Sequence, residues 1–279
     1  MPRPLRVASL TTLAMIAFAA NSLLCRVALR DTAIDAATFT SIRMASGALV
    51  LAALVLARRG QPLAAGSWRG AAMLFAYAAF FSFAYRQLTA ATGALLLFGA
   101  VQATMLASGL LSGERLRTLQ IAGLLVALAG LVGLLLPGLA APPPLAAAFM
   151  VAAGIAWGFY SLLGRGARDP SGATAGNFIR ALPFAAILSL ATIGDASIDL
   201  SGCLYAVLSG AIASGLGYAL WYAALPALPA ASAATIQLSV PALAALGGVV
   251  LLAEPMNGQL LACSAAILGG IALVTIRRR

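Results

Sequence analysis

Residues 119–136 read LQIAGLLVALAGLVGLLL, eighteen residues without a charged side chain. A helix with one face in water would not be apolar on all sides. At 1.5 Å per residue, this run spans most of a bilayer core about 30 Å thick. Similar runs fill the chain, since 62% of its 279 residues are hydrophobic, 9% are charged and the mean hydropathy is +1.02. A soluble domain would carry about a quarter charged residues, so the composition indicates an integral membrane protein.

Charged residues, prolines and glycines divide the apolar sequence into ten expected spans. These lie near residues 6–25, 35–57, 68–87, 91–112, 119–136, 145–164, 174–193, 201–223, 229–252 and 258–276. Their lengths suit helices, because a membrane β-strand needs only about ten alternating residues. The first run resembles a signal peptide, but its polar end has a counterpart later in the chain, so we interpret it as a span. The expected fold is an all-α membrane protein with ten transmembrane helices.

The arginines predict the orientation of the chain, because cytoplasmic loops are enriched in basic residues. With a cytoplasmic N-terminus, three arginines fall on the outer side, namely Arg26, Arg30 and Arg86. Twelve fall on the cytoplasmic side: Arg3, Arg6, Arg58, Arg59, Arg69, Arg115, Arg117, Arg165, Arg168, Arg277, Arg278 and Arg279. Both chain ends are therefore expected in the cytoplasm. The net charge of +10 reflects these loop arginines at the ends of apolar runs, so we expect lipids, and no nucleic acid, as partners.

Three short patterns recur at about half the chain length. Residues 22–26 read SLLCR and residues 161–165 read SLLGR, and an Ile-Arg pair ends at Arg43 and again at Arg180. Glu114 and Glu254 each precede an apolar run that contains a pair of small residues. Since each unit holds five spans, an odd number, the second unit must cross the membrane in the opposite sense. We expect two inverted five-helix repeats, residues 1–140 and 141–279, with a shared site near the bilayer midplane.

The same motifs resemble the EamA family of the drug/metabolite transporter superfamily. They are GERL at residues 113–116, QIAG at 120–123 and AEP at 253–255. The wider pattern is similar to that of the YddG-type aromatic amino acid exporters. The resemblance implies a multi-pass protein of the bacterial inner membrane that exports small metabolites, neutral or aromatic amino acids first among them. It leaves open a multidrug carrier or a nucleotide-sugar or sugar-phosphate carrier of the same superfamily.

Polar and aromatic residues inside the spans are candidates for a solute site, because polar groups in the bilayer core usually face a cavity or a partner. An intramembrane arginine can bind a carboxylate, reach outward to the interface or bond helix carbonyls; amides recognise polar groups or join helices. The expected substrate-binding residues are Asn21, Arg43, Tyr77, Phe98, Gln102, Trp157, Tyr160, Tyr218 and Gln237. This mixture of rings and amides favours an amphipathic solute over a phosphorylated one, which needs several cations.

The residue inventory disfavours enzymes and bound metals. The chain has no histidine, and its three cysteines lie far apart in the sequence. An intramembrane hydrolase would need a nucleophile with a base, a metal or two facing acids, and no expected span has an acid at its middle. We therefore expect no enzyme, no cofactor, no metal and no proton coupling through an embedded carboxylate. Inverted halves favour a carrier over a channel, and we expect it to act as a monomer.

Overall fold

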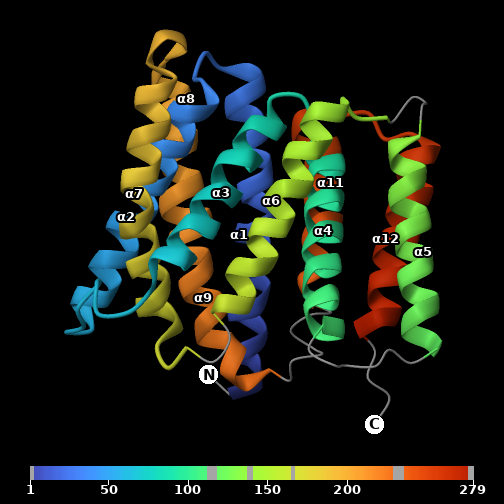
Figure 1. Cartoon of the computed structure of the whole chain (residues 1–279), viewed down its shortest axis with the longest axis horizontal. Coiled ribbons are helices and arrows are strands. Elements are labelled where there is room, and N and C mark those ends of the chain that lie inside the picture. The colour runs from blue at the N-terminus through green and yellow to red at the C-terminus, as the bar shows by residue number, and fades with distance from the viewer. Residues whose placement is uncertain (1–2, 112–117, 137–140, 165–166, 229–235, 276–279) are drawn as a thin grey trace.

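The computed structural model describes residues 3–111, 118–136, 141–164, 167–228 and 236–275, and over these residues it contains helices and no strand (Figure 1). The α-helices are α1 (Arg3–Asp31), α2 (Ala36–Ala57), α3 (Trp68–Tyr85), α4 (Ala90–Leu111), α5 (Thr118–Leu135), α6 (Pro144–Leu163), α7 (Pro170–Ala191), α8 (Leu200–Val207), α9 (Gly217–Ala224), α11 (Ser239–Leu252) and α12 (Gly258–Thr275). Short 3₁₀ helices follow α7 and α9, namely η1 (Ile193–Asp195) and η3 (Leu225–Ala227). A π-helical segment, η2 (Leu208–Leu216), joins α8 to α9.

Six of the described helical segments are long and apolar enough to cross a membrane, and three shorter apolar helices accompany them. The six are Leu5–Asp31, Ala36–Ala57, Ala90–Leu111, Pro144–Leu163, Pro170–Ala191 and Leu200–Ala224. The helix bounds follow the expected spans within a few residues, except that residues 229–235 of the ninth span lie outside the described residues. One boundary was wrong: α1 continues to Asp31, so Arg26 lies inside a helix and not in a loop after it.

Local sequence rules explain where several helices begin. The side chains of Asp35, Ser67, Asp169 and Asp199 each accept a hydrogen bond from a backbone N–H in the first turn of α2, α3, α7 and α8 respectively. These are residue types that cap free N–H groups at helix N-termini. Pro170 occupies the first turn of α7, where its missing N–H costs nothing. The residues at which these helices begin are thus determined by the local sequence.

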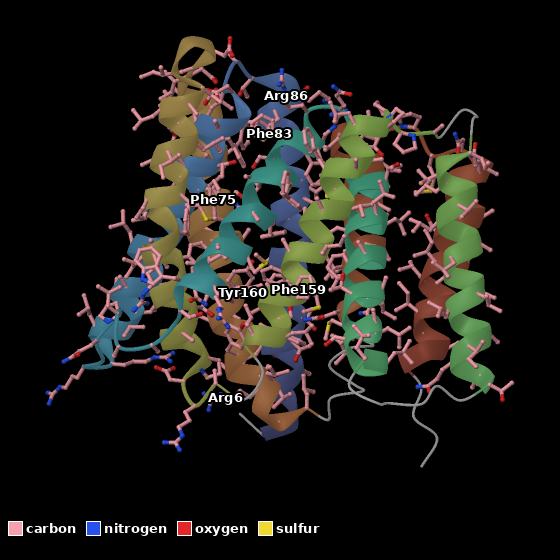
Figure 2. All side chains as sticks on the ribbon, viewed as in Figure 1. Arg6, Phe75, Phe83, Arg86, Phe159 and Tyr160 are labelled. Carbon is pink, nitrogen blue, oxygen red and sulfur yellow. The ribbon has the colours of Figure 1, made fainter. Side chains whose placement is uncertain are left out.

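The helices pack as a bundle in which segments far apart in sequence lie together. α2 packs against α7, α3 and α4 against α6, α4 against α11, and α5 against α12. The α5–α12 pair stands at one edge of the bundle, and α1 begins at the same end at which α12 finishes (Figure 1). Arg6 and Arg86 mark the two opposite ends (Figure 2). We call the end that carries Arg86 the outer end of the bundle, following the orientation expected from the arginines.

The π-helical segment η2 lies directly against α2 and α1. Gly210 makes this close approach possible, because a Cβ atom at this position would collide with the backbone oxygen of Arg43 and the hydroxyl of Ser46. Single turns of π-helix within longer helices often mark functional sites. Here the π-helical segment η2 packs against the part of α2 that carries Arg43.

Candidate functional site

A cavity lies among helices from both halves of the chain. Its volume is only about 30 Å³, and its walls come from α1, α3, α4, α6, η2, α9 and the segment just before α11. Six residues expected from the sequence line it: Asn21, Tyr77, Phe98, Trp157, Tyr218 and Gln237. Six others line it too: Phe18, Ser22, Phe81, Leu97, Ala213 and Ser214. Half of the lining residues are therefore aromatic, and serine hydroxyls and two amides supply its polar groups.

Trp157 is the centre of the aromatic wall. Its ring centroid lies 4.8 Å from that of Tyr77, 5.4 Å from that of Tyr218 and 5.2 Å from that of Tyr160. The pair with Tyr218 is stacked, with 25° between the ring planes. Such contacts contribute about 0.5–1.5 kcal/mol each beyond simple burial. Because the rings touch one another, a flat solute can enter between them only when the helices that carry them move apart.

A chain of hydrogen bonds runs along the polar side of the cavity. The Ser209 hydroxyl donates to Oδ1 of Asn21 at 2.7 Å, and Nδ2 of Asn21 donates to the Tyr77 hydroxyl at 3.3 Å. From the other side, Nη2 of Arg43 donates to the same hydroxyl at 3.1 Å. Two donors therefore converge on the oxygen of Tyr77, which leaves the proton of that hydroxyl to point elsewhere.

Arg43 lies one layer behind the cavity wall. Its guanidinium carbon is 5.2 Å from the ring centroid of Tyr77 and 5.0 Å from that of Phe81, and its side chain has no exposed surface. Both rings line the cavity, and the interaction is of the cation–π type. The Nε and Nη1 atoms are buried and have no hydrogen-bond partner among the described residues. Arg43 thus neither reaches out to an interface nor bonds a helix carbonyl.

Three intramembrane residues highlighted by the sequence lie away from the cavity lining. Gln102 is one turn beyond Phe98 on α4, is only partly buried and does not line the cavity. Tyr160 is buried behind Trp157, and its hydroxyl donates to that of Thr174 at 3.4 Å. Figure 2 shows Tyr160 within the bundle on α6. Arg180, which matches Arg43 in the repeat, lies outside the lining as well.

The Arg180 guanidinium is held by helix and loop carbonyls. It donates to the backbone oxygens of Leu63 at 3.0 Å, Ala65 at 2.8 Å and Gly176 at 3.2 Å. Carbonyl bonding was one of the readings left open for intramembrane arginines, and it describes Arg180. The two arginines that match in sequence therefore have different surroundings.

Several lining residues that the sequence interpretation missed stand at helical spacing from an expected residue or from one another. Phe18 precedes Asn21 by three residues and Ser22 by four, and Phe81 follows Tyr77 by four, so helical spacing would have found them. Ser214 stands four residues before Tyr218 and so has the same signal relative to that ring, but none relative to Ser209. In an α-helix at about 100° per residue it would point roughly 140° away from Ser209. The π-helical i→i+5 repeat brings these two serines onto similar directions, and both are buried.

A second polar cluster ties helices together at the outer end. Nε of Arg26 lies 3.0 Å from Oε1 of Glu254, and the two side chains are 11% and 5% exposed. Nη1 of Arg26 also donates to the backbone oxygens of Tyr85 and Arg86, while Oε2 of Glu254 accepts the N–H of Ala90 at 2.8 Å. This cluster joins α1, the end of α3, the start of α4 and the end of α11. Its repeat counterparts, Arg165 and Glu114, lie outside the described residues.

Within the described ranges, no group of three His, Cys, Asp or Glu side chains is placed to hold a metal ion.

The sequence profile of the EamA-like transporter family matches the chain twice, over residues 5–136 and 144–276. An uncharacterized protein of Pseudomonas aeruginosa is 60% identical over 274 residues, which cover 98% of this chain and 96% of that protein. A protein of known crystal structure superposes with a TM-score of 0.67 at 25% identity, covering 95% of this chain and 97% of the other.

Proposed function

Because this chain belongs to the EamA-like transporter family, whose members are multi-pass membrane transporters of small substrates, we propose that it exports small amphipathic metabolites by alternating access. Neutral and aromatic amino acids are the principal substrates in this proposal, as in the YddG-type exporters. The observation that carries it is the cavity walled by Tyr77, Phe98, Trp157 and Tyr218, with amide groups beside the rings. Rings of this kind suit an apolar solute body, and amides and hydroxyls suit its polar end.

Alternating access needs two halves that can move about a common site, and the helix packing supports such an arrangement. In a five-helix repeat, α2 corresponds to α7, α4 to α11 and α5 to α12, and each of these pairs is in contact. In the same scheme α1 corresponds to α6, and α3 corresponds to the continuous helical segment α8–η2–α9. α3 packs against α6, and α1 packs against α8, η2 and α9 in the equivalent way. The two family matches follow the same division. We propose that the halves are inverted repeats, 1–140 and 141–279, that open the cavity to one side at a time.

The proposal places the protein in the bacterial inner membrane as a monomer with both chain ends in the cytoplasm. Introduced cysteines test the orientation, in a background where Cys25, Cys203 and Cys263 are replaced by alanine. We expect a membrane-impermeant thiol reagent to label Ala196→Cys, in the exposed segment before α8, in intact cells. Ala64→Cys, in the exposed segment before α3, should react only after the cells are opened. Labelling of both positions from outside would contradict the proposed orientation.

Transport by purified protein in liposomes tests the substrate. Radiolabelled phenylalanine, tyrosine, leucine, an organic cation and a nucleotide sugar are offered in turn, with unlabelled solute on the opposite side to drive exchange. We expect saturable exchange of the aromatic amino acids, slower exchange of leucine and none of the nucleotide sugar. Exchange of the nucleotide sugar or the cation alone would select the alternative carrier functions.

The same vesicles test energy coupling. In the proposed mechanism the solute gradient drives export, because no carboxylate lies in the middle of the described spans to carry a proton. We therefore expect the rate of exchange to change little when a pH gradient is imposed. A strong acceleration by a gradient of the correct direction would show that protons are coupled to transport, and would refute this part of the proposal.

A further inference from the structure

We propose that the cavity selects a carboxylate, with the Tyr77 hydroxyl as its donor and the unpaired Arg43 guanidinium behind it as the counter-ion. This rests on the proposed function and specifies the charge of its substrates. The starting point is a buried cation without an anion. A guanidinium remains charged in proteins, and no carboxylate among the described residues lies within ion-pair distance of Arg43. A buried charge without a partner is costly, so the arrangement is complete only when an anion arrives.

Other arginines in the described spans show what a structural role looks like. Arg26 binds the carboxylate of Glu254 and two backbone oxygens, and Arg180 binds three backbone oxygens. Arg43 has one hydrogen bond, to Tyr77, and two buried nitrogen atoms without partners. An arginine that served only to join helices would have its donors satisfied in the same way. The charge of Arg43 is therefore not balanced by any anion among the described residues, although its guanidinium lies behind the cavity wall and does not itself line the cavity.

Tyr77 links Arg43 to the cavity, because it accepts a hydrogen bond from Arg43 and lines the cavity. Its oxygen accepts from Arg43 and from Asn21, and the Asn21 amide is oriented by the Ser209 hydroxyl. With both donors on its oxygen, Tyr77 has its own proton to give, and its side chain lines the cavity. A hydroxyl that accepts from a cation is a stronger donor. An anion in the cavity would receive that proton in a charge-assisted hydrogen bond.

Ser214 supplies a second donor in the same cavity. Its hydroxyl is buried, lines the cavity and has no partner among the described residues. A carboxylate has two oxygens and accepts several hydrogen bonds at once. A cationic solute would find no carboxylate in this wall and would be repelled by Arg43. The inferred ligand therefore carries a carboxylate at the polar side of the cavity and an apolar group against the rings of Trp157 and Tyr218.

Binding of matched ligands to the purified protein tests the inference. The probes are 3-phenylpropionate, phenylalanine and 2-phenylethylamine, which share one ring, together with butyrate and butylamine, which have none. Dissociation constants are measured by calorimetry and by tryptophan fluorescence, since Trp157 is in the cavity wall. We expect 3-phenylpropionate to bind at least about tenfold more tightly than 2-phenylethylamine, because the fixed charge of Arg43 favours one and opposes the other.

Four variants locate the source of the preference. Arg43→Gln should lower the acid-to-amine ratio by about tenfold, and Tyr77→Phe, which keeps the ring, by about threefold through the loss of one hydrogen bond. The matched controls are Arg180→Gln and Tyr85→Phe, a buried tyrosine outside the cavity lining. Both should keep the wild-type ratio. If Arg43→Gln does not fold, Arg43→Lys, which retains the charge, should preserve a preference for the acid.

The outcomes separate this inference from the proposed function. Equal or tighter binding of the amines by the wild type, or an unchanged ratio in folded Arg43→Gln, would overturn the inference while leaving an aromatic solute site. Butyrate binding as tightly as 3-phenylpropionate, with both amines excluded, would support the inference and refute the preference for aromatic solutes. Absence of binding by all five probes would overturn both.

Discussion

Arg26 and Arg43 lie in consecutive helices and are both withdrawn from solvent, yet their surroundings are opposite. Arg26, at the outer end, has the carboxylate of Glu254 and two backbone oxygens as partners. Arg43, near the cavity, has one tyrosine hydroxyl and two aromatic rings. Pairing at the outer end holds four helices together. The missing partner near the cavity leaves a place for a group that the protein itself does not supply.

This difference indicates which parts of the bundle are for stability and which are for solute. A buried ion pair contributes little net stability when made, but removal of one member leaves a charge without a partner and costs several kcal/mol. A buried arginine that already lacks a partner has no such pair to lose. Removal of the counter-ion of Arg26 should therefore cost more stability than replacement of Arg43 by an apolar residue.

The largest expected effect is on the outer cluster. Glu254→Gln should lower the free energy of unfolding by about 3 kcal/mol, because Arg26 loses its counter-ion while it remains mostly buried. Thermal unfolding in detergent, followed by circular dichroism, measures the loss. Asp195→Asn is the control, since that carboxylate is exposed and lies outside the cluster. A Glu254→Gln protein as stable as this control would mean that the pair does not hold the outer end.

The next effect concerns the aromatic wall. Trp157→Ala should lower exchange of an aromatic amino acid by about tenfold, the equivalent of about 1.4 kcal/mol, because its ring contacts both Tyr77 and Tyr218. Gln102→Ala serves as the comparison, since Gln102 lies outside the lining. Its effect should stay below about twofold, of the order of a contact that packs helices without touching solute. Equal losses in the two variants would remove the distinction between lining and non-lining residues. Exchange is measured in liposomes with the amount of folded protein matched.

A smaller effect is expected at a second outer-end contact. The Asp35 carboxylate accepts from the backbone N–H groups of Ala37, Thr38 and Ser197, and so caps α2 and ties it to the segment before α8. Asp35→Ala should cost about 1 kcal/mol, the usual loss for a helix cap. Partial burial acts to raise the pKa of Asp35, but the hydrogen bonds from Thr38, Ser197 and Ala37 outweigh it, so the pKa is lowered.

The pH dependence of that variant has a definite sign. A lowered pKa means that the stabilisation is complete above the unfolded value of about 3.9 and is lost as the pH falls through the folded value. The difference in stability between the wild type and Asp35→Ala should therefore be constant from pH 7 to 5 and shrink below pH 4. Unfolding by heat at a series of pH values measures it. A difference that grew on acidification would be inconsistent with a capping carboxylate.

The smallest change in stability is expected at Arg43, the buried arginine without an ionic partner. Arg43→Met should change the free energy of unfolding by about 1 kcal/mol or less, because an apolar side chain replaces a charge that has no ionic partner. The same thermal scans that are used for Glu254→Gln measure it. A loss as large as that of Glu254→Gln would show that Arg43 is a structural residue, and the comparison between the two arginines would fail.

Six of the nine residues expected at the site line the cavity, and the exceptions show where local reasoning ended. Arg43, Gln102 and Tyr160 are all intramembrane polar or aromatic residues, as the others are. The direction of a side chain around a helix axis decides whether it faces the cavity, a neighbouring helix or lipid. The position of a residue along an apolar span indicates only its depth in the membrane, and not the direction of its side chain. The spacing of Phe18 from Asn21 and from Ser22 would have extended the prediction, whereas nothing in the sequence marked residues 208–216 as a π-helix.

The sequence by itself determined the membrane character of the chain, the positions of its helices and the recurrence of its motifs. These follow from runs of apolar residues, capping residues and arginine placement, which act within one span or one loop. Only the tertiary structure decided that Glu254 pairs with Arg26, 228 residues away, and that Ser209 orients Asn21 across 188 residues. Such contacts depend on which helix faces meet, and every apolar span offers several faces of nearly equal hydrophobicity, so the choice among them is made by the whole bundle.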